Sequence, residues 1–235
     1  MESINVAWMY PNLLNLHGER GSVQMLVEVG KQLGVDVRIT RIEDFDDPID
    51  FDSFDLLMFL PGEISLFPHL IPALQAIGDY VEKGGYVLAL GTTGLMFGKS
   101  ILRENGSELT GLGLLDMTAK ERKFVFGDDL HIRLNDRDME LAGSQIQMAD
   151  VEAANPIGTT IYGRGNNGTG TEGARYKNLI YTDCMGPLFV KNPWFAEWIV
   201  KDILKNKGVE ITENGSYPIA ENAFKATLDF IKTKQ

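Results

Sequence analysis

The stretch from Tyr86 to Gly98 has the layout of a strand-to-helix elbow, the turn on which several hydrolases carry their nucleophile. An apolar run typical of a buried strand ends at Leu90, and an apolar helical segment begins within a few residues. The central residue of such an elbow is strained toward positive φ, and covalent catalysis needs Cys, Ser or Asp there. That position is Gly91. Glycine accepts the conformation without strain, but it has no side-chain atom that could attack a substrate.

Thr92, Thr93 and Cys184 are the other nucleophilic side chains that follow an apolar strand. A catalytic threonine is typically activated by its own N-terminal amine, which a mid-chain residue lacks, so we expect both threonines to cap the helix. Cys184 has no histidine within five positions, and a reactive thiol needs a nearby base or a lowered pKa. We therefore expect Cys184 to be a partly buried structural cysteine.

Composition narrows the class of protein further. Of the 235 residues, 22 are Lys or Arg and 33 are Asp or Glu, and the resulting charge of −11 disfavours nucleic acid as a partner. One cysteine excludes an internal disulfide, and the three histidines are not spaced as metal ligands, so we predict no metal site and no cofactor. No signal peptide or apolar run of membrane-spanning length is visible, which favours a cytoplasmic protein without a membrane span.

Hydrophobic periodicity places this elbow in an α/β fold. The first hundred residues alternate in the order β-α-β-β-α-β, which predicts a doubly wound, mostly parallel sheet with helices on both faces. Ligands of such sheets bind beyond the carboxyl ends of the strands, where Gly91 lies. Ser22 is the expected N-cap of the first helix. The expected strands are 4–9, 35–40, 54–60 and 86–90, and the expected helices are 23–33 and 70–81.

The second half of the sequence alternates polar and apolar residues more often. This pattern predicts short antiparallel strands, an exposed turn at 166–173, and a strand at 179–183 that returns to the central sheet. Two amphipathic helices close the chain. The expected short strands are 124–126, 131–134 and 144–148, and the expected helices are 193–206 and 220–234.

Several motifs resemble one family of enzymes. The segment 10–21 (YPNLLNLHGERG) is similar to the opening signature of the GatD family, in the cobyric-acid-synthase type of class I glutamine amidotransferases. Each further match would be weak alone, but together they follow the family's order along most of the chain. These matches are 108–116, 165–167, 172–173, 176–179, 186–187 and 191–193.

The resemblance implies a flavodoxin-like fold that releases ammonia from glutamine through a Cys–His pair. It also implies delivery of that ammonia to a Mur-ligase-like partner of the MurT type, which uses ATP to amidate the peptidoglycan precursor lipid II. On this view residues 1–208 form an amidotransferase-like domain, and 209–235 are a linker and helix packed on it. The family's cysteine position matches Gly91, and its histidine position, before the Gly-Pro pair, matches Met185. Neither catalytic group is present.

Two further positions depart from the family. The glycine-rich loop that offers N–H groups to the oxyanion is replaced by 60–63, where Pro61 has no N–H to donate. The family's substrate-binding arginine falls near Arg122, with Phe124 at the matching place. The predicted substrate pocket consists of Gly62, Glu63, Thr92, Thr93, Lys123 and Phe124.

Three functions fit these residues. Losing the nucleophile or base of a hydrolytic triad costs on the order of 10⁶-fold in rate, so we favour a pseudoenzyme that retains a Mur-ligase-like partner or a small-molecule ligand. A second hypothesis is an enzyme with altered hydrolase or transferase chemistry, built on Glu63, Asp183 and Thr92. The third is an active amidotransferase whose missing groups are supplied by a partner.

Overall fold

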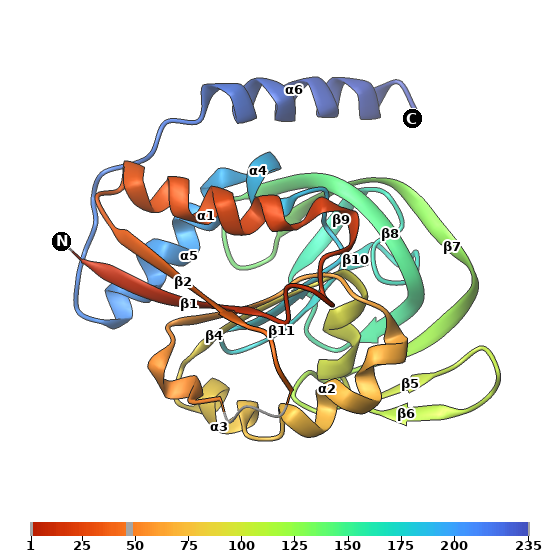
Figure 1. Cartoon of the computed structure of the whole chain (residues 1–235). Helices are drawn as coiled ribbons and strands as arrows, with labels where there is room; N and C mark the ends of the chain where they lie inside the picture. Colours follow the sequence, from red (N-terminus) through yellow and green to blue (C-terminus); the bar gives the residue numbers. More distant parts are fainter. Residues whose placement is uncertain (1, 46–48, 235) are drawn as a thin grey trace.

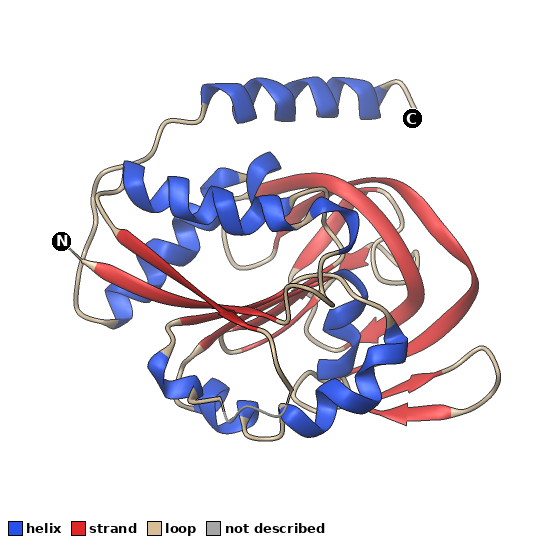
Figure 2. Ribbon diagram, in the orientation of Figure 1, coloured by secondary structure: helices blue, strands red, loops and turns tan. Residues whose placement is uncertain are grey.

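A computed structural model describes residues 2–45 and 49–234, and a six-stranded sheet of order β11-β12-β4-β3-β1-β2 forms its centre (Figures 1 and 2). All neighbouring strands pair in parallel except β11, which is antiparallel to β12. The predicted doubly wound, mostly parallel sheet is confirmed, including the late strand that returns beside β4. Its strands are β1 (Ser3–Met9), β2 (Asp36–Ile42), β3 (Leu56–Phe59), β4 (Tyr86–Leu90), β11 (Ala174–Tyr176) and β12 (Leu179–Thr182).

Helices cover both faces of this sheet (Figure 2). Strands β3 and β4 are buried at every position because apolar clusters pack on each side of them. One face carries α1 (Arg20–Gln32), α4 (Leu188–Lys191) and α5 (Pro193–Asn206), and the other carries α2 (Phe67–Ala73) and α3 (Ile77–Glu82). Short 3-10 turns are η1 (Leu16–Gly18), η2 (Phe51–Ser53), η3 (Ile64–Leu66) and η4 (Gly91–Phe97).

Two predictions about these helices are wrong in detail. The single helix expected over 70–81 is two helices, because Pro72 in α2 has no N–H to donate and Gly78 weakens the start of α3. Ser22 lies inside α1 and does not cap it, since the helix already begins at Arg20. The Ser22 hydroxyl instead donates to the carboxylate of Glu19, 3.0 Å away.

A second sheet is built on one long antiparallel pair that curves away from the central sheet (Figure 1). The short strands predicted at 124–126 and 131–134 are parts of one strand, β7, and 144–148 lies within β8. The prediction divided β7 at 127–130, because Gly127, Asp128 and Asp129 are residue types typical of turns. The strand in fact continues through them in regular pairing with β8, and its register shift, an exposed bulge, lies earlier, between Glu121 and Phe126. The strands are β5 (Ser100–Leu102), β6 (Glu108–Thr110), β7 (Met117–Leu134), β8 (Glu140–Ala153), β9 (Gly158–Tyr162) and β10 (Thr171–Glu172).

The last helix, α6 (Pro218–Lys232), packs over α4 and β8 at the top of Figure 1. Phe224 meets the ring of Trp194 edge-on at 5.1 Å between centroids, and the ring of His131 at 6.1 Å. After the helix, Lys234 forms ion pairs with Asp128 and Asp129 on β7. The domain boundary at residue 208 stays a prediction. None of the described helices is both long enough and apolar enough to cross a membrane.

We expect the ring contacts of Phe224 to hold α6 against Trp194 and His131. We expect Phe224→Ala to cost about 2 kcal/mol of local stability, because it removes the aromatic contacts that fix the helix. Amide hydrogen exchange across 220–231 should then accelerate roughly thirtyfold while the central sheet stays protected. Ile219→Ala is the matched control, since this side chain on the same helix is 86% exposed. Equal exchange in both variants would show that Phe224 does not anchor α6.

Candidate functional site

Gly91 and Met185 meet at the carboxyl edge of the central sheet. Gly91 directly follows β4 with φ +59°, the conformation expected of the elbow residue, although the segment that follows is the 3-10 turn η4 and not an α-helix. A Cβ on Gly91 would lie 2.6 Å from the Met185 sulfur and 3.2 Å from Cβ of Pro61. The structure thus brings together the two positions that the family resemblance assigns to the nucleophile and base. A thioether fills the space that a Cβ at position 91 would need.

The end of β3 closes the site from the other side. Pro61 packs against Gly91, and its ring nitrogen carries no hydrogen that could bind an oxyanion. The Thr93 hydroxyl donates to the carbonyl oxygen of Leu60 at 2.8 Å, so it links the elbow to β3. The prediction that Thr92 and Thr93 cap a helix is wrong, because both lie inside η4, whose N-cap is Leu90 and which has no side-chain cap hydrogen bond.

A buried carboxylate holds the chain just after Met185. Glu19 accepts hydrogen bonds from the backbone N–H groups of Gly186 and Leu188, the latter at 3.1 Å, and from the Ser22 hydroxyl. Burial raises the pKa of Glu19, and these N–H and O–H donors act in the opposite direction by stabilising its charged form. The backbone beside position 185 is therefore fixed from α1, although no base is presented there.

Two further buried acids hold the chain just before Met185. Glu172 accepts hydrogen bonds from the Asp183 N–H at 2.7 Å and from the Thr182 hydroxyl at 3.0 Å. Burial and the nearby Asp183 raise the pKa of Glu172 to about 8, and burial raises the pKa of Asp183 to about 7. The next residue, Cys184, is buried and its thiol pKa is raised well above the usual value, in keeping with the expected structural role.

A cavity of about 530 Å³ opens beside this elbow. Three residues predicted for the substrate pocket, Gly62, Glu63 and Thr92, line it. Thr93 is buried and bonded to the backbone. Lys123 and Phe124 lie at the bulge of β7 outside the cavity, where Phe124 is 75% exposed. The remaining lining residues are Leu16, His17, Ile64, Ser65, Arg103, Glu121, Val125, Ile146 and Met148.

Several of these lining residues were not predicted. Arg103 forms an ion pair with Glu121 at 2.6 Å, which lowers the pKa of Glu121. Only strand pairing brings these two side chains together, so local sequence patterns could not reveal them. His17 belongs to the opening motif, so the sequence could have indicated it as a residue of the site. It lies at φ +60°, and burial lowers its pKa.

The cavity does not bring together the residues proposed for altered hydrolase or transferase chemistry. Asp183 is buried behind the sheet edge, where it accepts the Tyr181 hydroxyl at 3.0 Å, and it does not line the cavity with Glu63 and Thr92. Arg122, near the family's substrate-binding position, donates to Asp150 at 2.7 Å, an acceptor that it shares with Arg164. Within the described residues, no group of three or more His, Cys, Asp or Glu side chains could hold a metal ion.

Comparison with known proteins gives two similar sequences and a similar structure. No family profile matches the chain. The lipid II isoglutaminyl synthase (glutamine-hydrolyzing) subunit GatD of Streptococcus pneumoniae is 29% identical, over 87% of this chain and 82% of that protein. The subunit of the same name from Staphylococcus aureus is 23% identical, over 89% and 88%. The glutaminase domain of Trypanosoma brucei CTPS, with bound acivicin, has a TM-score of 0.56 at 10% identity, over 91% and 98%, and so shares the fold.

The contact between Gly91 and Met185 can be measured as a coupling energy. We expect Gly91→Ala to destabilise the protein by about 3 kcal/mol, because it adds a positive-φ penalty and a steric clash. In a Met185→Ala background the same change should cost only about 2 kcal/mol, because the clash with sulfur is removed while the φ penalty and the tight approach to Pro61 remain. Urea unfolding of the four proteins gives these values. The control is Gly34→Ala, at φ +70° with open space around it, whose cost should not depend on residue 185. Additive costs at positions 91 and 185 would show that the two do not touch.

The buried acids predict a pH dependence of stability. Unfolded Glu172 loses its proton near pH 4, whereas the folded side chain keeps it until about pH 8, so the folded state binds more protons in this window. The free energy of unfolding should therefore fall as pH rises from 5 to 8. Glu172→Gln should make the profile less steep, because glutamine stays neutral while Asp183, whose pKa burial raises to about 7, still contributes.

Thermal unfolding across this pH range measures the effect. Glu28→Gln, at an exposed position on α1, should follow the parent protein. A parent protein that gains stability between pH 5 and 8 would contradict the assignment.

Proposed function

Because the chain is a GatD-like homologue of the class I glutamine amidotransferases, we propose that it is a non-catalytic member of this group. In this role it is a pseudoenzyme that does not hydrolyse glutamine. It serves as the cytoplasmic partner of a Mur-ligase-like protein of the MurT type in the amidation of peptidoglycan precursors.

One observation supports the proposal that the chain does not hydrolyse glutamine. The elbow presents Gly91, and the facing position presents Met185, so the pair has neither a nucleophilic atom nor a titratable nitrogen. The loss of either group from a hydrolytic triad lowers the rate on the order of 10⁶-fold. Pro61 removes an N–H group from the region of the oxyanion, which lowers the expected rate further. The lone thiol cannot substitute, because Cys184 is buried with a raised pKa.

The proposal of a partner rests on the names of the similar proteins and on the share of their length that this chain spans. Both are named as the GatD subunit of lipid II isoglutaminyl synthase, and the chain spans 82% and 88% of their lengths. Shared sequence of this extent supports retention of the surface that such a subunit uses. A MurT-type protein is therefore the partner we propose.

The cavity beside Gly91 supports a ligand-binding role within that complex. It is of ordinary size for a small-molecule site and places Glu63, Thr92 and His17 around an otherwise largely apolar wall. A ligand in this cavity would contact the elbow at Thr92 but would not be hydrolysed. We propose that the site binds a small molecule in place of turning over glutamine.

The proposal is tested by turnover and by association. The purified chain should release no ammonia from glutamine above the uncatalysed background, alone or with a MurT-type protein. Sedimentation of the mixture should show a complex that the separate proteins do not form.

Gly91→Cys/Met185→His is the informative variant, since it restores both groups in a site where the thioether no longer blocks position 91. Ammonia release by the variant alone would support a retained scaffold. Turnover by the unmodified chain would overturn the non-catalytic part, and a mixture that sediments as two separate species would overturn the partner.

A further inference from the structure

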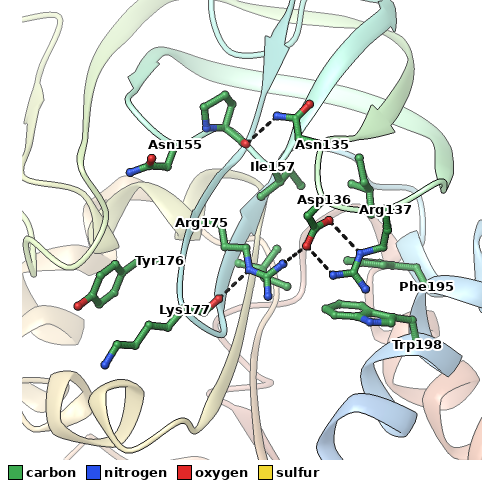
Figure 3. Close-up of a pocket in the computed structure, with 13 residues that line it drawn as sticks. Asn135, Asp136, Arg137, Asn155, Ile157, Arg175, Tyr176, Lys177, Phe195 and Trp198 are labelled. Carbon is green, nitrogen blue, oxygen red and sulfur yellow. Dashed lines mark hydrogen bonds and ion pairs between the residues drawn. The ribbon is translucent and has the colours of Figure 1, made fainter.

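A second cavity, of about 570 Å³, lies near the amino end of strand β12, whereas Gly91 lies at the carboxyl ends of the strands. Figure 3 shows the residues that line this cavity. Gly91 follows the carboxyl end of β4, whereas Arg175 and Tyr176 at the end of β11 and Lys177 in the turn after it precede the amino end of the parallel strand β12. The other walls come from the β7–β8 turn at 135–137, the loop at 155–157, and α5. The cavity is therefore separate from the amidotransferase-like site.

Two guanidinium groups in this cavity are held in fixed positions. Arg137 stacks on Trp198, with 3.5 Å from its central carbon to the ring centroid, and donates two hydrogen bonds to Asp136. Arg175 donates from Nε to the Lys177 carbonyl at 2.7 Å and from Nη1 to the same Asp136 (Figure 3). Their side chains are only 21% and 28% exposed. Such anchoring lowers the entropy that a ligand would otherwise have to remove from the two side chains.

In the part of the chain that the structure describes, each of the two arginines has N–H donors without a protein acceptor, and together they carry more positive charge than Asp136 neutralises. Among the described residues, Arg137 Nη1 and Arg175 Nη2 have no hydrogen-bond partner. Two guanidinium groups face the one carboxylate of Asp136, and the Lys177 ammonium is already paired with Glu82 at 2.6 Å. The site therefore holds one surplus positive charge.

The rest of the wall is apolar. Leu134, Ile157, Ile180 and Phe195 line the cavity beside the arginines. A ligand that buries an apolar body there gains about 25 cal/mol for each Å² removed from water. A planar carboxylate matches the geometry of guanidinium N–H groups, and its single charge matches the surplus.

We propose that this cavity binds a small organic monocarboxylate with an apolar body. The carboxylate takes the free N–H groups of Arg137 and Arg175, and the apolar body lies against Ile157 and Phe195. The site is independent of the proposed pseudoenzyme function, so either can fail without the other.

Binding of 4-phenylbutyrate to the full chain tests this proposal, with calorimetry and tryptophan fluorescence as readouts because Trp198 lies in the wall. We expect saturable binding, at least tenfold weaker binding of the neutral analogue 4-phenylbutyramide, and no tighter binding of inorganic phosphate. Arg175→Gln should weaken carboxylate binding at least tenfold. Arg38→Gln, at an exposed arginine of β2 that is paired with Asp36, should leave it unchanged.

Arg175→Lys keeps the charge without the planar fork and provides a second variant should Arg175→Gln unfold; it should also weaken binding. Absence of saturable carboxylate binding by the parent chain, equal affinity for the amide, tighter binding of phosphate, or full affinity in a folded Arg175 variant would each overturn the proposal.

Discussion

The Met185 thioether lies against the bare Cα of Gly91, and three separate segments depend on this contact. Pro61 at the end of β3, the elbow after β4 and the loop after β12 converge there. Position 91 has a positive φ, so glycine relieves the strain, and its missing Cβ makes room for sulfur. A nucleophile at this position would compete with methionine for the same volume. Packing therefore couples the residue types that positions 91 and 185 can carry.

The surrounding polar framework keeps the shape of a site that has no reactive pair. Glu19 binds backbone N–H groups after Met185, and Glu172 binds the backbone before it. Buried carboxylates are costly to retain without partners, and here each satisfies donors of the loop. The backbone of the loop is therefore fixed on both sides of Met185. This rigidity is consistent with the proposed partner role, in which residue 185 takes no part in a reaction.

Local sequence patterns predicted the central sheet well, because continuous apolar runs such as those of β3 and β4 mark strands buried on both faces. They failed where a long strand contains turn-forming residues: β7 looked like separate strands because Gly127, Asp128 and Asp129 lie between its two apolar segments. The bulge at Lys123 to Val125 puts Lys123 and Phe124 outside the cavity that Val125 lines. The Arg103–Glu121 and Asp136–Arg175 ion pairs join residues brought together only by tertiary folding, so spacing could not identify them.

The central claim is that position 91 and its surroundings contain no activated nucleophile. Acivicin, which is bound in the Trypanosoma brucei glutaminase structure, provides a direct probe. After incubation with acivicin, the intact mass of the chain should remain unchanged, while Gly91→Cys/Met185→His gains the mass of one adduct on the peptide that contains residue 91. An adduct on the unmodified chain, at Cys184 or at any residue lining the cavity beside Gly91, would contradict the account.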